Sequence, residues 1–262
     1  MFDNVCKFLA ETFSTDFAAW LIGQPRTLTE LSPAELSLEP IRADALILLQ
    51  AEDMVLHLEF QTQPDASIPF RMIDYRLRVY RRFPQKAMHQ FVIYLSATES
   101  DLVQQTAFVL PRTRHEFEVI RLWEQNPESF LQTPGLLPFA ALCQTDDSSA
   151  VLRQAAQRIQ EIQDPRVKSN LAASTAILAG LVLKKDLIRR ILRSELMRES
   201  VIYQEIREEG LEEGRAEGRA EAMREVALKL IQQNLPLEQI ALVTELPLET
   251  LRQLADESTP LS

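Results

Sequence analysis

Strand-like segments are confined to the first half of the chain, and the second half is helical in composition throughout. Short apolar runs bounded by polar turns occur up to about residue 127, and segments with helical periodicity lie between them. Beyond that point only helical patterns follow. This division predicts a mixed α/β sheet core flanked by helices, with an all-helical C-terminal extension.

The first half alternates between helix and strand. Apolar residues recur at helical spacing in the N-terminal segment, and two apolar runs on either side of a short polar turn predict a β-hairpin. A later amphipathic segment places Phe70, Ile73, Leu77 and Tyr80 along one helical face. The expected elements are a helix over residues 3–22, a hairpin over 41–49 and 54–60, a helix over 70–83, and strands over 90–95 and 116–123.

The second half divides into a helical region and a charged tail. We expect residues 1–127 to form the α/β core, 128–198 to form helices packed on that core, and 199–262 to form a charged helix and a short helical tail. Gly210, Gly214 and Gly218 recur every four residues, so they fall on one helical face. Such a face permits close helix association and a homodimer through the C-terminal helix, although a solvated helix has the same pattern. The helices are expected over 137–142, 151–163, 167–183 and 185–234, with two shorter ones over 235–255 that meet near residues 245–247.

Composition excludes several classes of protein. The chain has 262 residues, of which 46% are hydrophobic and 25% charged, so its bulk is globular rather than disordered. Two cysteines, Cys6 and Cys143, cannot form a disulfide framework or a thiolate zinc site. The longest apolar run is too short to span a bilayer, and no signal peptide is evident at the N-terminus. A reduced, cytoplasmic protein without membrane contact is therefore expected.

The net charge of −10 is unevenly distributed. Arginines concentrate in residues 70–86, whereas glutamates concentrate in residues 199–225. This balance argues against a surface that wraps nucleic acid entirely. It leaves one local basic stripe as a candidate polyanion site.

Two acidic side chains interrupt the apolar strands of the expected hairpin. If the turn is centred between Ala51 and Glu52, Asp44 faces Glu59 across the hairpin. Carboxylates at such positions repel each other unless a cation lies between them. A divalent metal such as Mg²⁺, with Mn²⁺ as a substitute, accounts for the pair. A hairpin with both acids exposed to solvent would have the same sequence pattern. A glycoside hydrolase also uses two carboxylates.

Neighbouring groups extend this candidate metal site. Period-two alternation places Gln61 and His57 on the face of Glu59. The Gln61 amide can hold an attacking water or a phosphate oxygen, but it cannot act as a base. The backbone carbonyl of Phe60 is a candidate third metal ligand.

These residues resemble those of the PD-(D/E)XK nuclease superfamily, and within it the Rpn-type recombination-promoting nucleases and transposase-like proteins. The similar stretches cover most of the chain and are EPIRADALILL (39–49), LHLEFQTQPDASIPFRMIDYRLRVYRR (56–82), QFVIYL, VIRLWEQNPESFL, GLLPFAAL and EEGRAEGRAE. The resemblance implies a restriction-endonuclease-like fold, with Asp44 and Glu59 as the paired acids. It also implies that Gln61 stands where the family usually has lysine, and that Asp3 or Glu11 is the acidic residue of the first helix.

The resemblance also gives the basic helix a role. Arg71, Tyr75, Arg78 and Arg82 are the expected contacts to double-stranded DNA, with Arg81 as an alternative to Arg82. Tyr75 is expected either to bind a phosphate or to pack against the hairpin. Phosphate contacts of this kind fix position without reading sequence. A solvated basic helix face has the same composition.

Two main hypotheses follow, from different classes. The first is an Mg²⁺-dependent DNA endonuclease, a hydrolase connected with recombination or mobile elements. The second is a catalytically silent nuclease-like protein that self-associates through its C-terminal helices. A carboxylate enzyme acting on a sugar or another small molecule is a third interpretation.

Overall fold

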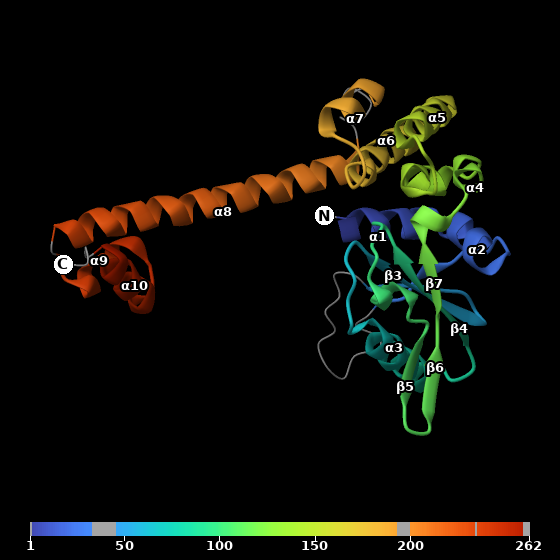
Figure 1. Cartoon of the computed structure of the whole chain (residues 1–262), viewed down its shortest axis with the longest axis horizontal. Coiled ribbons are helices and arrows are strands. Elements are labelled where there is room, and N and C mark those ends of the chain that lie inside the picture. Colours follow the sequence, from blue (N-terminus) through green and yellow to red (C-terminus); the bar gives the residue numbers. More distant parts are fainter. Residues whose placement is uncertain (1, 33–45, 193–199, 234, 259–262) are drawn as a thin grey trace. The chain divides into compact units, whose positions relative to one another are not determined.

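The computed structural model describes residues 2–32, 46–192, 200–233 and 235–258 (Figure 1). The chain divides into two compact units, Met1–Gln204 and Glu205–Ser262. The first unit contains a mixed α/β core, as the sequence predicts, and the second is helical in its described residues. None of the helices in these ranges is both long enough and apolar enough to cross a bilayer.

A five-stranded mixed sheet forms the centre of the first unit. The first three strands in its order are antiparallel neighbours, and the last three are parallel. The order is β1 (Thr29–Glu30), β2 (Leu46–Gln50), β3 (Met54–Gln61), β4 (Ala87–Tyr94) and β7 (Glu118–Arg121).

Helix α3 (Ile68–Arg82) makes the crossover that two parallel strands require between β3 and β4. Pro69 lies in its first turn, where the missing N–H of proline is tolerated. The helix ends before Phe83, which precedes Pro84 and is therefore disfavoured in helical geometry. Its buried residues are Ile68, Met72, Tyr75 and Val79, whereas Phe70, Leu77 and Tyr80 of the apolar face expected from sequence are exposed.

The predicted hairpin is present as β2 and β3, but its predicted register is wrong. Glu59 pairs with Leu46, and the Ala51 N–H donates to the Met54 carbonyl. The turn is therefore centred between Glu52 and Asp53, one residue later than expected. The difference arises because a two-residue turn closes the hairpin at Ala51 and Met54. Asp44 lies outside the described residues.

The sheet is covered on both faces. One face packs against α3, where Leu48, Val55 and Tyr75 belong to one apolar cluster. On the other face, Phe60 stacks on Phe139 and meets the edge of Phe17. Burial on both faces explains why β3 is continuously apolar except at a few polar positions.

Three elements cover the second face. They are α1 (Phe2–Thr12), α2 (Ser14–Ile22) and the 3₁₀ helix η5 (Pro134–Leu142). The single helix expected over residues 3–22 is divided at Phe13. A Cβ on Gly135 would lie 2.3 Å from the Phe13 Cβ, so glycine allows η5 to approach this break closely.

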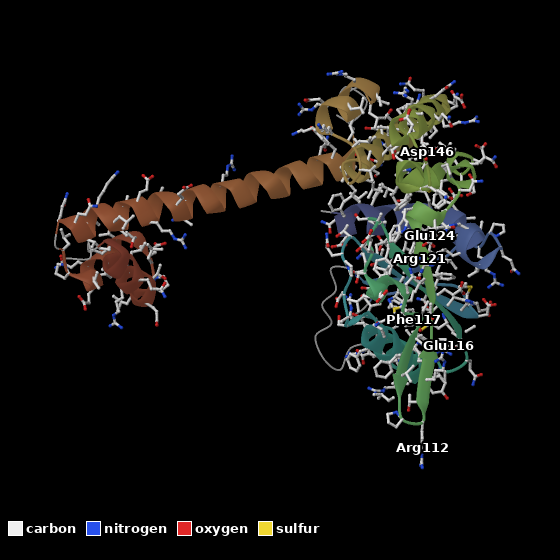
Figure 2. All side chains as sticks on the ribbon, in the orientation of Figure 1. Arg112, Glu116, Phe117, Arg121, Glu124 and Asp146 are labelled. Atoms are coloured by element: carbon white, nitrogen blue, oxygen red, sulfur yellow. The ribbon has the colours of Figure 1, made fainter. Side chains whose placement is uncertain are left out.

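A two-stranded sheet, β5 (Ala107–Leu110) and β6 (Thr113–Glu116), was not expected from the sequence. Arg112 lies at its tip with a φ of 64° (Figure 2). Phe108 of β5 packs against Phe70 of α3. The strand expected over 116–123 is accordingly shorter, because residues up to Glu116 belong to β6.

The remaining helices of the first unit lie mostly in the predicted helical region, but the single helix expected over 185–234 is wrong. α7 (Lys185–Ile191) ends before Leu192, and α8 (Val201–Gln232) begins after the non-helical Ser200. Asp147 and Asp164 cap α5 and α6 by accepting two backbone N–H groups each, which explains where these helices begin. The short 3₁₀ helix η3 (Asp101–Gln104) lies between β4 and β5. After β7 come η4 (Leu122–Glu124), α4 (Pro127–Leu131), η5, α5 (Ser148–Glu161), α6 (Pro165–Ala179) and α7 (Lys185–Ile191).

The second unit has a small core of its own. The end of α8 (Val201–Gln232) packs against α9 (Leu237–Thr244) and α10 (Leu248–Ser258) through the buried residues Ala227, Ile240 and Leu251. The two short helices expected near residues 245–247 are confirmed, and Glu245 ends α9 in a left-handed conformation.

Candidate functional site

The site is built around Glu59, whose side chain is completely buried near the end of β3. The interpretation in which Glu59 points to solvent is therefore wrong. Alternation along β3 puts Glu59 on the face that α3 covers. A carboxylate at this depth is stable only with charged or hydrogen-bonding partners.

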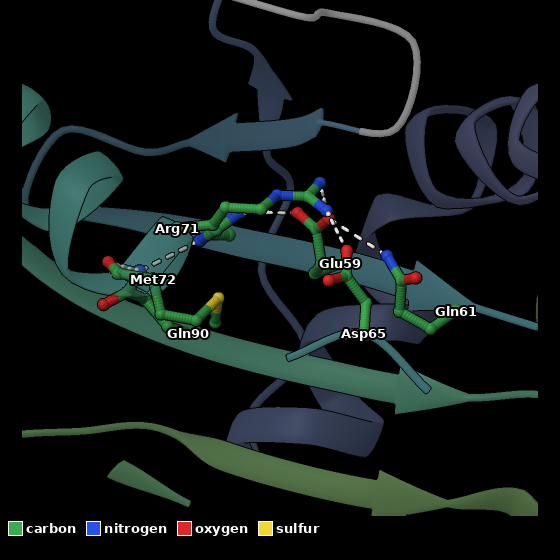
Figure 3. Close-up of polar contacts among 7 residues, drawn as sticks. Glu59, Gln61, Asp65, Arg71, Met72 and Gln90 are labelled. Atoms are coloured by element: carbon green, nitrogen blue, oxygen red, sulfur yellow. Dashed lines mark hydrogen bonds and ion pairs between the residues drawn. The ribbon is translucent and has the colours of Figure 1, made fainter. Parts of the chain in front are cut away.

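Arg71 supplies the principal partner. Its guanidinium, one turn into α3, forms an ion pair with Glu59 Oε1 through Nη2 (Figure 3). Nη1 of the same group lies 3.5 Å from Asp65 Oδ2. One guanidinium is thus shared by two carboxylates, and these three groups together carry a formal charge of −1.

Asp65 belongs to the loop between β3 and α3. Its Oδ1 accepts the backbone N–H of Ser67 at 2.8 Å. The hydrogen bonds from Ser67, followed by the charge of Arg71, lower the pKa of the Asp65 carboxyl below its ordinary value. Asp65 is therefore held as a carboxylate beside Glu59.

Gln61 is the third polar group at this end of β3. Its Nε2 donates to Glu59 Oε1 at 3.2 Å, and its side chain is half-buried. Gln61 and Arg71 therefore converge on one oxygen of Glu59 (Figure 3). The backbone carbonyl of Gln61 accepts the N–H of Leu95, which holds this end of β3 in place.

The other Glu59 oxygen faces His57. The distance between Glu59 Oε2 and His57 Nε2 is 3.5 Å, and both side chains are fully buried. His57 Nδ1 lies 3.0 Å from Nε2 of Gln90, which stands opposite it on β4. Each Glu59 oxygen thus has a different set of neighbours.

Two tyrosines border the site. Burial, and then the negative charge of Glu59, raise the pKa of Tyr75. The pKa of Tyr94 is raised by burial and then by Asp65 and Glu59. Both phenols therefore stay protonated, and neither can act as a base near neutral pH.

The four residues expected to contact DNA have different surroundings in the structure. Arg71 is engaged with the two carboxylates, Arg78 pairs with Asp74 at 2.9 Å, and Tyr75 packs edge-on against His57. Arg82 is exposed at the end of α3. Tyr75 packs in the core with Leu48 and Val55 of the hairpin strands, so the expected packing of Tyr75 against the hairpin is confirmed.

Among the other predicted site residues, Asp44 lies outside the described ranges and Glu11 lies away from Glu59. Glu11 pairs with Lys7 at 3.6 Å and lies near Glu30 of the edge strand β1, and β2 separates β1 from β3. Burial raises the pKa of Glu11. Asp3 lies in the first turn of α1, and the side chain of Phe60 packs on the opposite face of the sheet, which leaves only its backbone available as a ligand.

Sequence reasoning missed Asp65, Gln90 and His115. Parallel pairing of β3 with β4 brings Gln90 beside His57, although 33 residues separate them. The unexpected β5–β6 hairpin brings His115 to Gln90. The available signal was Gln90 itself, a polar residue at the start of a buried apolar strand.

Arg121, at the end of β7, is a further cation in this half of the sheet, and its side chain is half-buried. Its Nε lies 2.8 Å from Glu124 Oε1, and its Nη1 donates to the Val103 carbonyl. Its charge also acts on Tyr94. Arg121 is thus tied to η3 and η4 and holds the end of β7.

The geometry suits a cation that is shared between carboxylates. Within the described ranges, no three His, Cys, Asp or Glu side chains are close enough together to hold a metal ion. Glu59 and Asp65 could supply two oxygen ligands to such a cation, and Gln61 an amide oxygen. That number suits Mg²⁺, which usually takes one or two protein carboxylates and keeps several waters.

Comparison of the chain with protein-family models, with curated proteins and with solved structures found no match to any of them.

Proposed function

We propose that the chain is a divalent-metal-dependent DNA endonuclease with a restriction-endonuclease-like core. The observation that carries the proposal is the completely buried Glu59 carboxylate, which shares one cation with Asp65 at the end of a central strand. A buried acid held in this way is expensive for a purely structural sheet.

The residues fit a metal ion. Glu59 and Asp65 are carboxylates that already share one cation, the guanidinium of Arg71, and Asp65 is held ionised. A metal between Glu59 and Asp65 would replace the guanidinium of Arg71, and Asp44 and the Phe60 carbonyl are further candidate ligands from the sequence. A bound Mg²⁺ or Mn²⁺ would lower the pKa of a water molecule and stabilise charge on the phosphate.

The chain's own residues account for the other requirements of the reaction. Arg71, once released from Glu59, is placed to contact a phosphate oxygen. Gln61 is placed to orient a water molecule beside Glu59. The antiparallel hairpin of β2 and β3, followed by α3 and the parallel strand β4, supports the restriction-endonuclease-like assignment.

Double-stranded DNA is the proposed substrate. Arg81 and Arg82 are exposed in the last turn of α3, which begins at the site. With a net charge of −10 on the chain, these few cations would give binding that weakens steeply as salt rises.

Cleavage of supercoiled and linear duplex DNA by the purified chain tests the proposal. We expect products with Mg²⁺ or Mn²⁺ and none with a chelator. Glu59→Gln and Asp44→Asn should each reduce cleavage to the metal-free level, whereas the exposed control Glu161→Gln should retain it. Undiminished cleavage by Glu59→Gln would show that the nuclease activity does not arise at this site.

A catalytically silent, self-associating protein is the second candidate. Two observations favour it: Arg71 already neutralises Glu59, and α9 exposes Leu242 and Val243 to 83% and 63%. Light scattering on the full chain and on Leu242→Glu distinguishes the candidates. A dimer that the substitution converts to a monomer, together with no DNA cleavage, would favour the second candidate.

A further inference from the structure

Three polar side chains lie beside the buried Glu59 on the sheet face that α3 covers. His57 of β3, Gln90 of β4 and His115 of β6 follow one another at hydrogen-bond distance, and His57 ends beside Glu59. His57 is fully buried, and Gln90 nearly so. Polar groups at this depth are costly unless their hydrogen bonds are specific.

The Met72 carbonyl fixes the orientation of the Gln90 amide. The atom of Gln90 that lies 2.8 Å from the Met72 oxygen must be a donor, because a carbonyl only accepts. That atom is therefore Nε2, and the other end of the amide is Oε1. Gln90 Oε1 lies 2.8 Å from His115 Nε2, which must then carry a proton.

The same amide fixes the tautomer of His57. Nε2 of Gln90 has a second hydrogen, and His57 Nδ1 lies 3.0 Å away. Because that amide nitrogen cannot accept, His57 Nδ1 must be the acceptor. In neutral imidazole the proton then resides on Nε2, which faces Glu59 Oε2 at 3.5 Å.

The two facing atoms have no alternative. His57 Nε2 and Glu59 Oε2 are both buried and face each other at 3.5 Å, and neither has a hydrogen-bond partner in the described part of the chain. Arg71 and Gln61 meanwhile approach Glu59 only at Oε1. The Glu59 carboxylate therefore has the His57 Nε2–H facing Oε2 and the Arg71 guanidinium at Oε1.

We infer that His57 is a positioning residue that orients Glu59, and that Gln90 selects the tautomer of His57 for this purpose. The inference rests on the proposed function. The Nε2–H of His57 faces Glu59 Oε2 and holds that oxygen toward the core, so that Glu59 Oε1 is presented to the cation. Partners of this kind behind a ligating carboxylate typically contribute about 10–100-fold to metal affinity or activity.

The tautomer can be observed directly in the metal-free full-length chain. The sequence contains three histidines, His57, His89 and His115, so long-range ¹H–¹⁵N spectra of the imidazoles can be assigned by single substitutions. We expect the Nε2–H form of His57 in the native chain and a mixture of forms in Gln90→Leu. An Nδ1–H form in the native chain would overturn the inference.

Metal binding tests the functional consequence. His57→Leu removes the donor, whereas His57→Gln keeps an amide N–H with comparable reach. We expect the Mn²⁺ dissociation constant, measured by calorimetry, to rise about 10–100-fold in His57→Leu and to be largely restored in His57→Gln. We expect saturating Mn²⁺ to recover much of the single-turnover cleavage rate of Gln90→Leu.

A purely structural role would destabilise both His57 variants without separating their metal affinities, and that outcome would overturn the inference. If the native chain binds no Mn²⁺ and cleaves no DNA, the proposed function fails. Glu59→Gln then tests the contact between His57 Nε2 and Glu59 Oε2 by itself. If the NMR signal of His57 Nε2–H has the same chemical shift in this variant as in the native chain, the contact is also overturned.

Discussion

Replacing Arg71 by methionine should destabilise the first unit strongly, because it leaves the Glu59 carboxylate buried without its cation. Removing one member of a fully buried ion pair costs about 3–5 kcal/mol. Arg71 is 26% exposed, so water can reach part of the space that the guanidinium leaves. We therefore expect a loss of about 3 kcal/mol, at the lower end of that range. Methionine retains most of the aliphatic volume, so the loss reports the charge rather than a cavity.

Urea unfolding followed by tryptophan fluorescence measures this loss in the relevant unit. The chain contains two tryptophans, Trp20 and Trp123, and both belong to the first unit. Their signal therefore does not report unfolding of the second unit. Glu59→Gln removes the buried charge, so Arg71→Met should cost less than about 1 kcal/mol in that background.

Mn²⁺ extends the same measurement to the proposed metal site. At 100 times its dissociation constant, a ligand specific to the folded state stabilises it by about 2.7 kcal/mol. At an Mn²⁺ concentration about 100 times the dissociation constant of Arg71→Met, the folded state of this variant should be stabilised by close to this amount. At the same Mn²⁺ concentration the native chain should be stabilised less, because Arg71 competes with the metal for Glu59. Equal losses from Arg71→Met in the native and Glu59→Gln backgrounds would refute the ion-pair reasoning.

Three other predictions concern packing and protonation. Gly135→Ala should destabilise the first unit by about 2 kcal/mol in urea unfolding, because its Cβ would lie 2.3 Å from the Phe13 Cβ and 2.9 Å from Asp16 Oδ2; an unchanged midpoint would contradict this packing. Burial, and then Arg76, lower the pKa of His115 below 6.5, so an NMR titration should give a lower midpoint. Folding favours the neutral form of His115, so this residue contributes fully to the free energy of unfolding above pH 6.5. That contribution is lost as the pH falls from 6.5 through the folded pKa, and this pH dependence should be absent in His115→Gln. Burial raises the pKa of Cys143 to about 12, so iodoacetamide at about pH 8 should label this thiol only after unfolding, as mass spectrometry can verify.

Local patterns in the sequence determined most of the elements. The hairpin of β2 and β3, helix α3, strand β4 and the helices after residue 127 follow from periodicity and turn residues, which act over a few neighbouring positions. Glu59 was identified because a charge within an apolar strand is unusual. Its partners on the same strand, His57 and Gln61, followed from alternation alone.

Only the tertiary structure decided which face of α3 is buried and what surrounds Glu59. The helix has two apolar stripes, and packing on the sheet chose Met72 and Tyr75 over Leu77 and Tyr80. That choice turned Arg71 toward the sheet and brought Asp65 with it. Gln90 reached His57 through the parallel pairing of β3 with β4. Such pairings depend on the free energy of burying whole faces together, which no short stretch of sequence contains.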